Sequence, residues 1–198
     1  MNTKFLITAD SNRSALLKKK IIHYYIANGD ATIAELCKEM DLSIPTVTKL
    51  VGELLDDGYI LDFGKQETNG GRKPNIYGLN PVSGYFVGVD VFRSKINIAA
   101  VDFKGDKLRV EENIPYSLEN TPEALEMLCN LINDFIDRLS VPREKVLAVG
   151  VNISGRVNPV SGYSYSIFYR LVAYTLLDRE TSSIGEAFVN HEVNLGLK

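Results

Sequence analysis

The sequence predicts a protein in two parts, an α+β part that is followed by an α/β part. Three segments with helical spacing of apolar residues precede residue 58, and two short strand-like runs follow them. From residue 82 onward the pattern changes to strand-rich runs with one long amphipathic helix among them. The change falls at Asn80-Pro81, so we predict one domain over residues 11–80 and a second over residues 84–198.

The composition is typical of a water-soluble protein. The 198 residues are 45% hydrophobic and 24% charged, with a formal net charge of −3. No long apolar run suited to a membrane helix occurs, and the N-terminus lacks the apolar core and cleavage site of a secretory signal. Cys37 and Cys129 have no CxxC partner and make no recognisable zinc pattern with the two histidines. We therefore expect a cytoplasmic protein with reduced thiols, no membrane partner, no metal and no cofactor.

Two helices are predicted before residue 42. Residues 14–27 place apolar side chains at positions 16, 17, 21, 22, 25 and 26, which is helical spacing, and Asn28-Gly29-Asp30 ends this helix. A second helix begins at Thr32, where Glu35 three residues later completes a capping box. It ends near Asp41.

Cations of the first part are gathered in two clusters. Residues 1–80 contain 10 basic and 10 acidic residues, so bulk charge does not draw this part to nucleic acid. The clusters are Lys18-Lys19-Lys20 and Arg72-Lys73. The three lysines either lie on phosphates beside a bound duplex or form a solvated helix face, and the sequence favours neither.

A third helix is predicted over residues 44–57, and its two faces differ. Ser43 caps it, and Pro45 stands in its first turn, where a missing N–H is tolerated. The apolar face consists of Val47, Leu50, Val51, Leu54 and Leu55. The opposite face is short, polar and weakly cationic, and it contains Pro45, Thr46, Lys49 and Gly52.

Small hydroxyls beside one cation suit close approach to base edges and phosphates in a major groove. On this helix alone, a solvated face is an equal alternative. The residues that we predict to contact DNA from this helix are Ser43, Pro45, Thr46, Thr48 and Lys49.

A hairpin with a basic tip follows the third helix and favours the DNA-contacting alternative. Gly58 ends the helix, and YILDFG (59–64) and NIYGL (75–79) are typical of strands. Three helices followed by a hairpin make a winged helix-turn-helix. Gly70 and Gly71 let the hairpin tip approach another backbone closely.

Arg72 and Lys73 follow those glycines. At this tip they would meet phosphates or enter a narrow minor groove, where cations are favoured. We therefore add both residues to the predicted DNA contacts.

The second part reads as one α/β lobe. Residues 82–92, 95–103 and 107–116 are strand-rich, and a helix with a clear apolar face runs from Pro122 to about Leu139. VLAVGVNI (146–153) is a fully apolar strand, and a glycine-rich loop follows it. The pattern predicts three antiparallel strands, a crossover helix and a parallel strand.

Four stretches resemble the ROK family (repressors, open reading frames, kinases), in its branch of transcriptional regulators. They are SNRSALLKKKII, LSIPTVTKLVGELLDDGYI, TNGGRKPNIYGLNPVSGYFVGVDV and AVGVNISGRVNPVSG. The resemblance covers about residues 11–166. The resemblance implies a winged helix-turn-helix followed by a lobe of the actin-like ATPase (ribonuclease H-like) fold, which in this family binds a sugar.

The resemblance also implies that the second domain is not an active kinase. Kinases of the family begin this lobe with an Asp, a glycine-rich stretch and a Thr that hold phosphate, whereas residues 90–95 here contain no glycine. In the family's catalytic motif, Glu192 stands in place of the aspartate and His191 in place of an asparagine. We expect no enzyme activity and no catalytic residues.

Family members continue with a second lobe, so we expect this chain to hold an incomplete effector domain, truncated before that lobe. The remnants of the sugar side would be Ser154, Gly155, His191 and Glu192, and binding of a sugar or sugar phosphate would be weak or lost.

The sequence thus predicts a regulator, a repressor of sugar metabolism, that binds double-stranded operator DNA and forms a homo-oligomer if the remaining lobe permits. Two alternatives stay open. One is a protein-interaction or dimerisation module without a role on DNA, and the other, less favoured, is a sugar kinase.

Overall fold

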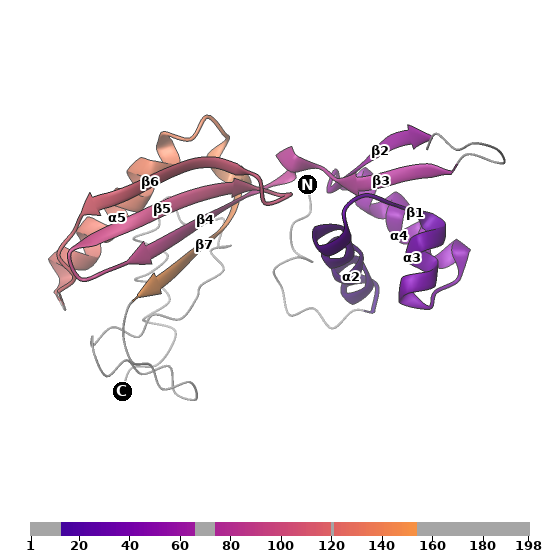
Figure 1. The fold of residues 1–198 in the computed structure, drawn as a ribbon, viewed down its shortest axis with the longest axis horizontal. Coiled ribbons are helices and arrows are strands. Elements are labelled where there is room, and N and C mark those ends of the chain that lie inside the picture. The colour runs from indigo at the N-terminus through magenta and orange to yellow at the C-terminus, as the bar shows by residue number, and fades with distance from the viewer. Residues whose placement is uncertain (1–12, 66–73, 120, 154–198) are drawn as a thin grey trace. The chain divides into compact units, whose positions relative to one another are not determined.

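The computed structural model describes residues 13–65, 74–119 and 121–153 (Figure 1). Contacts divide these residues into two compact units, with the division after Ser83 and with residues 103–105 grouped with the first unit. Among the described residues, no helix is both long enough and apolar enough to cross a membrane.

The first unit consists of three helices and a small antiparallel sheet. The helices are α2 (Arg13–Asn28), α3 (Ile33–Met40) and α4 (Ile44–Asp56). The strands are β1 (Ala31–Thr32), β2 (Ile60–Lys65) and β3 (Asn75–Leu79), in the order β1-β3-β2. Strand β1 is absent from the sequence prediction, and the other five elements agree with it within a few residues.

The core of this unit lies between the helices and the sheet. Its fully buried members are Ile21, Leu36, Val47, Leu54 and Tyr59. The apolar face predicted for α4 is the face that packs inward, with Leu55 half-buried at its edge. Gly58 ends this helix with a positive φ of 76°, a conformation that glycine adopts without steric cost.

The capping box predicted for α3 is present. The backbone N–H of Thr32 donates to the Glu35 carboxylate at 2.8 Å, and the Glu35 N–H donates to the Thr32 hydroxyl at 3.3 Å. These hydrogen bonds favour the ionised carboxylate and lower the pKa of Glu35. Asp41 closes the helix in the left-handed conformation.

The cap predicted at Ser43 is correct in position but wrong in its hydrogen bond. Ser43 is the N-cap of α4, yet its hydroxyl bonds no backbone N–H and instead lies 2.8 Å from the Thr46 hydroxyl. The reason is local: Pro45 supplies no N–H to be capped, and Thr46 offers a side-chain hydroxyl at the next position.

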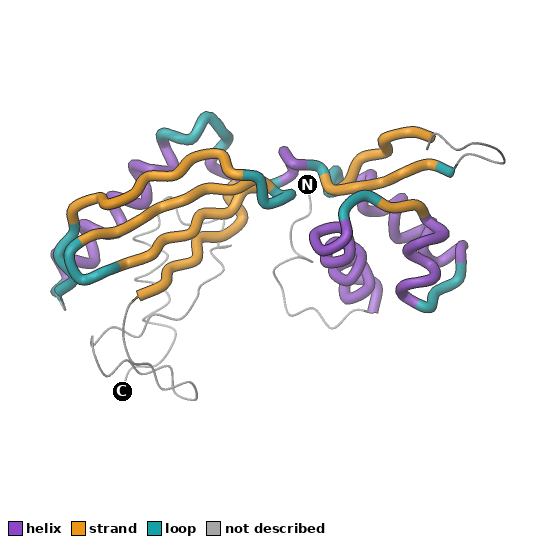
Figure 2. The backbone as a smooth tube through the Cα atoms, viewed as in Figure 1, coloured by secondary structure: helices purple, strands orange, loops and turns teal. Residues whose placement is uncertain are grey.

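The second unit is a four-stranded sheet with one long helix on it. The strands are β4 (Tyr85–Val91), β5 (Lys95–Asp102), β6 (Lys107–Pro115) and β7 (Val146–Ile153), and the helix is α5 (Pro122–Asp137). Figure 2 shows the strands side by side in the order β6-β5-β4-β7. The pairs β4–β5 and β5–β6 are antiparallel, and β7 is parallel to β4, as the sequence predicts.

Side chains alternate across this sheet, so that one face packs against α5 and the other does not. Strand β5 shows this directly, since Ile96, Ile98 and Ala100 are fully buried with the helix residues Ile132 and Phe135. Cys129 of α5 lies in the same core, whereas Cys37 of α3 is half-buried in the first unit. The opposite sheet face contains exposed residues such as Phe86 and Val110.

Candidate nucleic-acid interface

Helix α4 presents to solvent the residues that the sequence assigns to DNA. Ser43, Pro45, Thr46, Thr48 and Lys49 are all exposed. Val47, Leu50, Val51 and Leu54 are 0–4% exposed and hold the helix against the core. The exposed face is therefore carried by a rigid support, which favours precise placement against another molecule.

The N-terminal half of α4 is electrostatically suited to an anion. Its first turn contains no acidic residue, and the helix dipole places partial positive charge at this end. The Lys49 side chain is 78% exposed, and it is loosely paired with Glu53 at 3.9 Å. An exposed pair of this length is weak, so Lys49 can exchange Glu53 for a phosphate at little cost.

Glu53 and Asp57 at the far end of α4 are paired with a lysine of α2. Lys18 Nζ lies 2.7 Å from Glu53 Oε2 and 3.7 Å from Asp57 Oδ2, and its side chain is only 14% exposed. The structure thus assigns Lys18 an internal role, whereas Lys20 on the same helix is exposed. Lys18 also offsets the negative charge that would otherwise repel a polyanion approaching α4.

The wing is described at its base but not at its tip. Asp62 of β2 fixes the hairpin, because its carboxylate accepts from the Asn75 amide and from the Gly64 N–H, both at 2.8 Å. Arg72 and Lys73, predicted to contact DNA, lie outside the described residues, as do Gly70 and Gly71.

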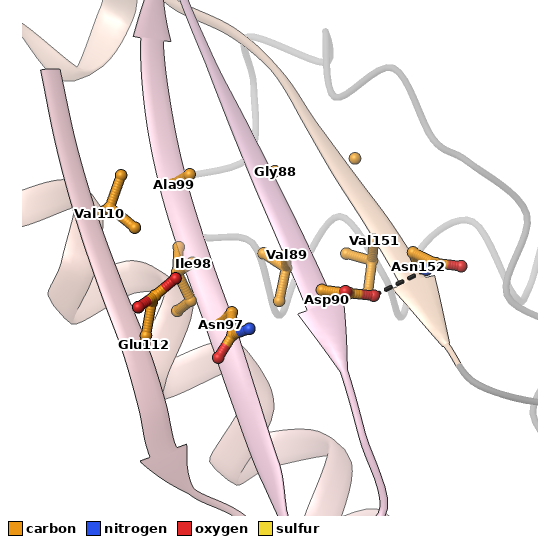
Figure 3. A pocket seen from close by; sticks show the side chains of 11 residues that line it. Gly88, Val89, Asp90, Asn97, Ile98, Ala99, Val110, Glu112, Val151 and Asn152 are labelled. Atoms are coloured by element: carbon orange, nitrogen blue, oxygen red, sulfur yellow. Dashed lines mark hydrogen bonds between the residues drawn. The ribbon is translucent and has the colours of Figure 1, made fainter. Parts of the chain in front are cut away.

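A second candidate site is a hollow on the face opposite α5 of the sheet formed by strands β4 to β7 (Figure 3). It measures about 570 Å³ and is floored by Gly88, Ala99 and Gly150, which lack side chains long enough to fill it. At one end the Asn152 amide donates to Asp90 Oδ1 at 2.7 Å. Asn97 and Glu112 also line it.

These carboxylate and amide groups are suited to hydrogen-bonding a ligand that carries hydroxyl groups. The described residues contain no cluster of three or more His, Cys, Asp or Glu side chains that would hold a metal ion. The predicted sugar-side residues Ser154, Gly155, His191 and Glu192 lie outside the described residues, and Asp90, Asn97, Glu112 and Asn152 were not among the predicted site residues. The sequence shows them only as polar alternation along strands, a signal that any solvated sheet face also gives.

Comparison with known proteins agrees with this geometry. A family model described as winged helix-turn-helix DNA-binding matches residues 16–60. A putative xylose repressor of Caldicellulosiruptor sp. (strain Rt8B.4) is 27% identical over 152 residues, which are 76% of this chain and 37% of that protein. The xylose repressor of Bacillus subtilis (strain 168) is 25% identical over 142 residues, 71% of this chain and 36% of that protein.

The DNA-binding transcriptional dual regulator NagC of Escherichia coli (strain K12) is 28% identical over 135 residues, 68% of this chain and 33% of that protein. The chain therefore spans only between a third and two-fifths of the length of these relatives.

A crystal structure of a ROK family transcriptional regulator, a homolog of the Escherichia coli MLC protein, has the same fold. It superimposes with a TM-score of 0.59 at 19% identity, over 80% of this chain and 41% of that one. The matched domain, the relatives and the shared fold confirm the resemblance and the fold class predicted from the sequence. The chain has the architecture of a ROK-type regulator, a winged helix-turn-helix joined to part of a sugar-kinase-like domain.

Proposed function

We propose that the chain is a sequence-specific DNA-binding repressor of genes of sugar metabolism. The observation that carries this is the exposed face of α4, where small hydroxyls and one cation stand at the positive end of a firmly packed helix. The match of residues 16–60 to a winged helix-turn-helix DNA-binding model supports it. The names of the relatives, repressors for xylose and N-acetylglucosamine, support the link to sugars.

In this proposal each part of the first unit has a separate role on the duplex. Ser43, Pro45, Thr46, Thr48 and Lys49 face the major groove, where the hydroxyls sample base edges and Lys49 holds a phosphate. Arg72 and Lys73 reach phosphates or the minor groove from the wing. The chain binds as a homo-oligomer to operator DNA with repeated half-sites. It is located in the cytoplasm.

The second unit is proposed to be a non-catalytic domain. Family kinases hold phosphate at the turn after β4. Here a hydrogen bond spans this turn, because the Phe92 N–H donates to the Lys95 carbonyl at 2.8 Å. The carbonyls of Arg93 and Ser94 accept from Leu118 and Tyr116. Because the Phe92 N–H is already paired and residues 90–95 contain no glycine, this turn is poorly suited to wrap its backbone around a phosphate.

A sugar remains the proposed effector class, and its binding is proposed to be weak or lost. Of the hydrogen-bonding residues that line the hollow, Asp90 and Asn97 are half-buried and Asn152 is exposed, so water reaches them. Solvent-exposed hydrogen bonds contribute about 0.5–1.5 kcal/mol each, against an estimated cost of 4 kcal/mol or more for immobilising a ligand.

DNA binding by the full chain tests the function. A DNA duplex is first selected from a random-sequence pool, and its dissociation constant is then measured by fluorescence anisotropy over a series of salt concentrations. Thr46→Ala and Lys49→Ala should weaken binding, and Lys49→Ala and Arg72→Ala should each reduce the slope of log K against log salt by about one. Because Thr46 and Lys49 are exposed, their substitution should change stability by less than about 0.5 kcal/mol.

Lys107→Ala is the matched control, since Lys107 is an exposed lysine of β6 and should leave affinity and slope unchanged. Adding xylose or N-acetylglucosamine to the same assay should not change the dissociation constant below millimolar concentrations. Failure to select any duplex would refute the DNA-binding role. Equal losses in Lys107→Ala and Lys49→Ala would refute the assignment of α4 as the contact surface.

A further inference from the structure

Ile44, the first residue of α4, is exposed at the end of the helix that reads DNA in the proposed function. The residue is 65% exposed, the largest exposed fraction among the large hydrophobic residues that the structure describes. The sequence prediction named Ile44 neither in the apolar face of this helix nor among the DNA contacts. The packed face of α4 begins at Val47, as predicted, so Ile44 lies outside it.

Ile44 lies among the residues of the proposed contact surface. Ile44 and Thr48 are four residues apart and form one row along the helix, while Pro45 and Lys49 form the adjacent row. All four residues are exposed. An apolar branched side chain therefore stands between hydroxyl and cationic groups, at the end of a recognition helix that enters the major groove.

The chemistry of isoleucine limits what it can recognise there. It has no hydrogen-bond donor or acceptor, so it cannot read the polar edges of bases or hold a phosphate. The major groove offers one apolar feature, the 5-methyl group of thymine, and apolar side chains contact it. As a β-branched residue on a helix, Ile44 is restricted at χ1, so its methyl groups are held in place before binding.

We propose that Ile44 is a specificity-determining residue that selects thymine at one position of the operator by packing against its 5-methyl group. This rests on the proposed function, since it requires α4 to lie in the major groove. Thr48, in the same row, supplies the neighbouring polar contact. Loss of the buried methyl contact should weaken binding about three- to fivefold, the value expected for one methyl group.

The test removes the methyl group from either partner. In the duplex selected with the full chain, each thymine is replaced in turn by deoxyuridine, which lacks only the 5-methyl group. For the wild-type chain, one such replacement should weaken binding about three- to fivefold. With Ile44→Ala the thymine and deoxyuridine duplexes should bind equally at that position, and Ile44→Val should retain part of the difference.

Thr48→Ser is the matched control, because it removes a methyl group from the same row and keeps the hydroxyl. It should retain the full difference between thymine and deoxyuridine. The proposal is overturned if no deoxyuridine duplex binds more weakly, if Ile44→Ala keeps the difference, or if Thr48→Ser abolishes it. If no duplex is selected at all, the proposed function itself fails, which distinguishes that failure from the failure of the methyl contact.

Discussion

Lys18 is held inside the first unit by two carboxylates of α4, and this separates it from the lysines that follow it. Its partners Glu53 and Asp57 lie 35 and 39 residues further along the chain. Nothing in the sequence separates Lys18 from the two lysines that follow it. The packing of α2 on α4 is what partly buries Lys18 and places it beside its carboxylate partners. The same holds for Ile44, whose exposure follows from where the buried face of α4 begins.

We predict that Lys18→Met lowers the free energy of unfolding by about 1 kcal/mol, because it removes the cation beside Asp57 and leaves Glu53 only its loose pair with Lys49. Urea denaturation followed by circular dichroism measures this. Lys20→Met is the matched control and should change stability by less than about 0.5 kcal/mol, since Lys20 is exposed. Equal losses in the two variants would show that the ion pairs contribute nothing.

At the scale of elements, the helices were predictable and the shortest strand was not. The capping box at Thr32 and the glycine at position 58 mark helix ends through local chemistry, which a sequence displays. Strand β1 is only Ala31–Thr32, and it exists because Ala31 and Thr32 pair with Tyr77 and Ile76 of β3. A two-residue pattern in the sequence cannot predict pairing with a strand that lies 44 or more positions further along the chain.

Two glycines of the first unit should respond oppositely to the same substitution. At Gly78 of β3 an added Cβ would lie 1.9 Å from Asp30 Oδ1, 2.5 Å from its Cγ and 2.9 Å from the Phe63 ring. At Gly52 of α4 it would meet nothing within 4 Å. We expect Gly78→Ala to destabilise the chain by about 1–3 kcal/mol through steric overlap.

Gly52→Ala should instead stabilise it by up to about 1 kcal/mol, through the helix propensity of alanine. Urea denaturation of both variants gives the sign of each change. A neutral Gly78→Ala would mean that Asp30 moves aside freely, and the close packing at the base of the wing would then have no energetic role.

At the scale of the whole molecule, the order of elements was predictable because each unit follows its own hydrophobic period. Alternation in residues 95–102 predicts a strand with one buried face, and the spacing in residues 122–137 predicts an amphipathic helix. The hollow beside Asp90 and Asn152 was not predictable, because it depends on strands β4 and β7, which are 62 residues apart at that hydrogen bond. The exposed face of α4 was predicted only in part. Helical periodicity identified its polar residues, but it did not identify Ile44 as an exposed member of that face.

The chain has two cysteines, and the structure places them in chemically unequal surroundings. Cys129 is on the buried side of α5 and is 4% exposed, and burial raises the pKa of its thiol to about 11, so almost no thiolate forms there near neutral pH. Cys37 on α3 is half-buried and open to reagent. The native protein should therefore accept one equivalent of maleimide quickly, at Cys37, and a second only after denaturation, as peptide mass spectrometry can verify. Equal labelling of both thiols in the native state would contradict this.

A fluorophore can then be attached at Cys37, beside the recognition helix, without any mutation. The labelled wild-type chain would then report contact with a duplex directly.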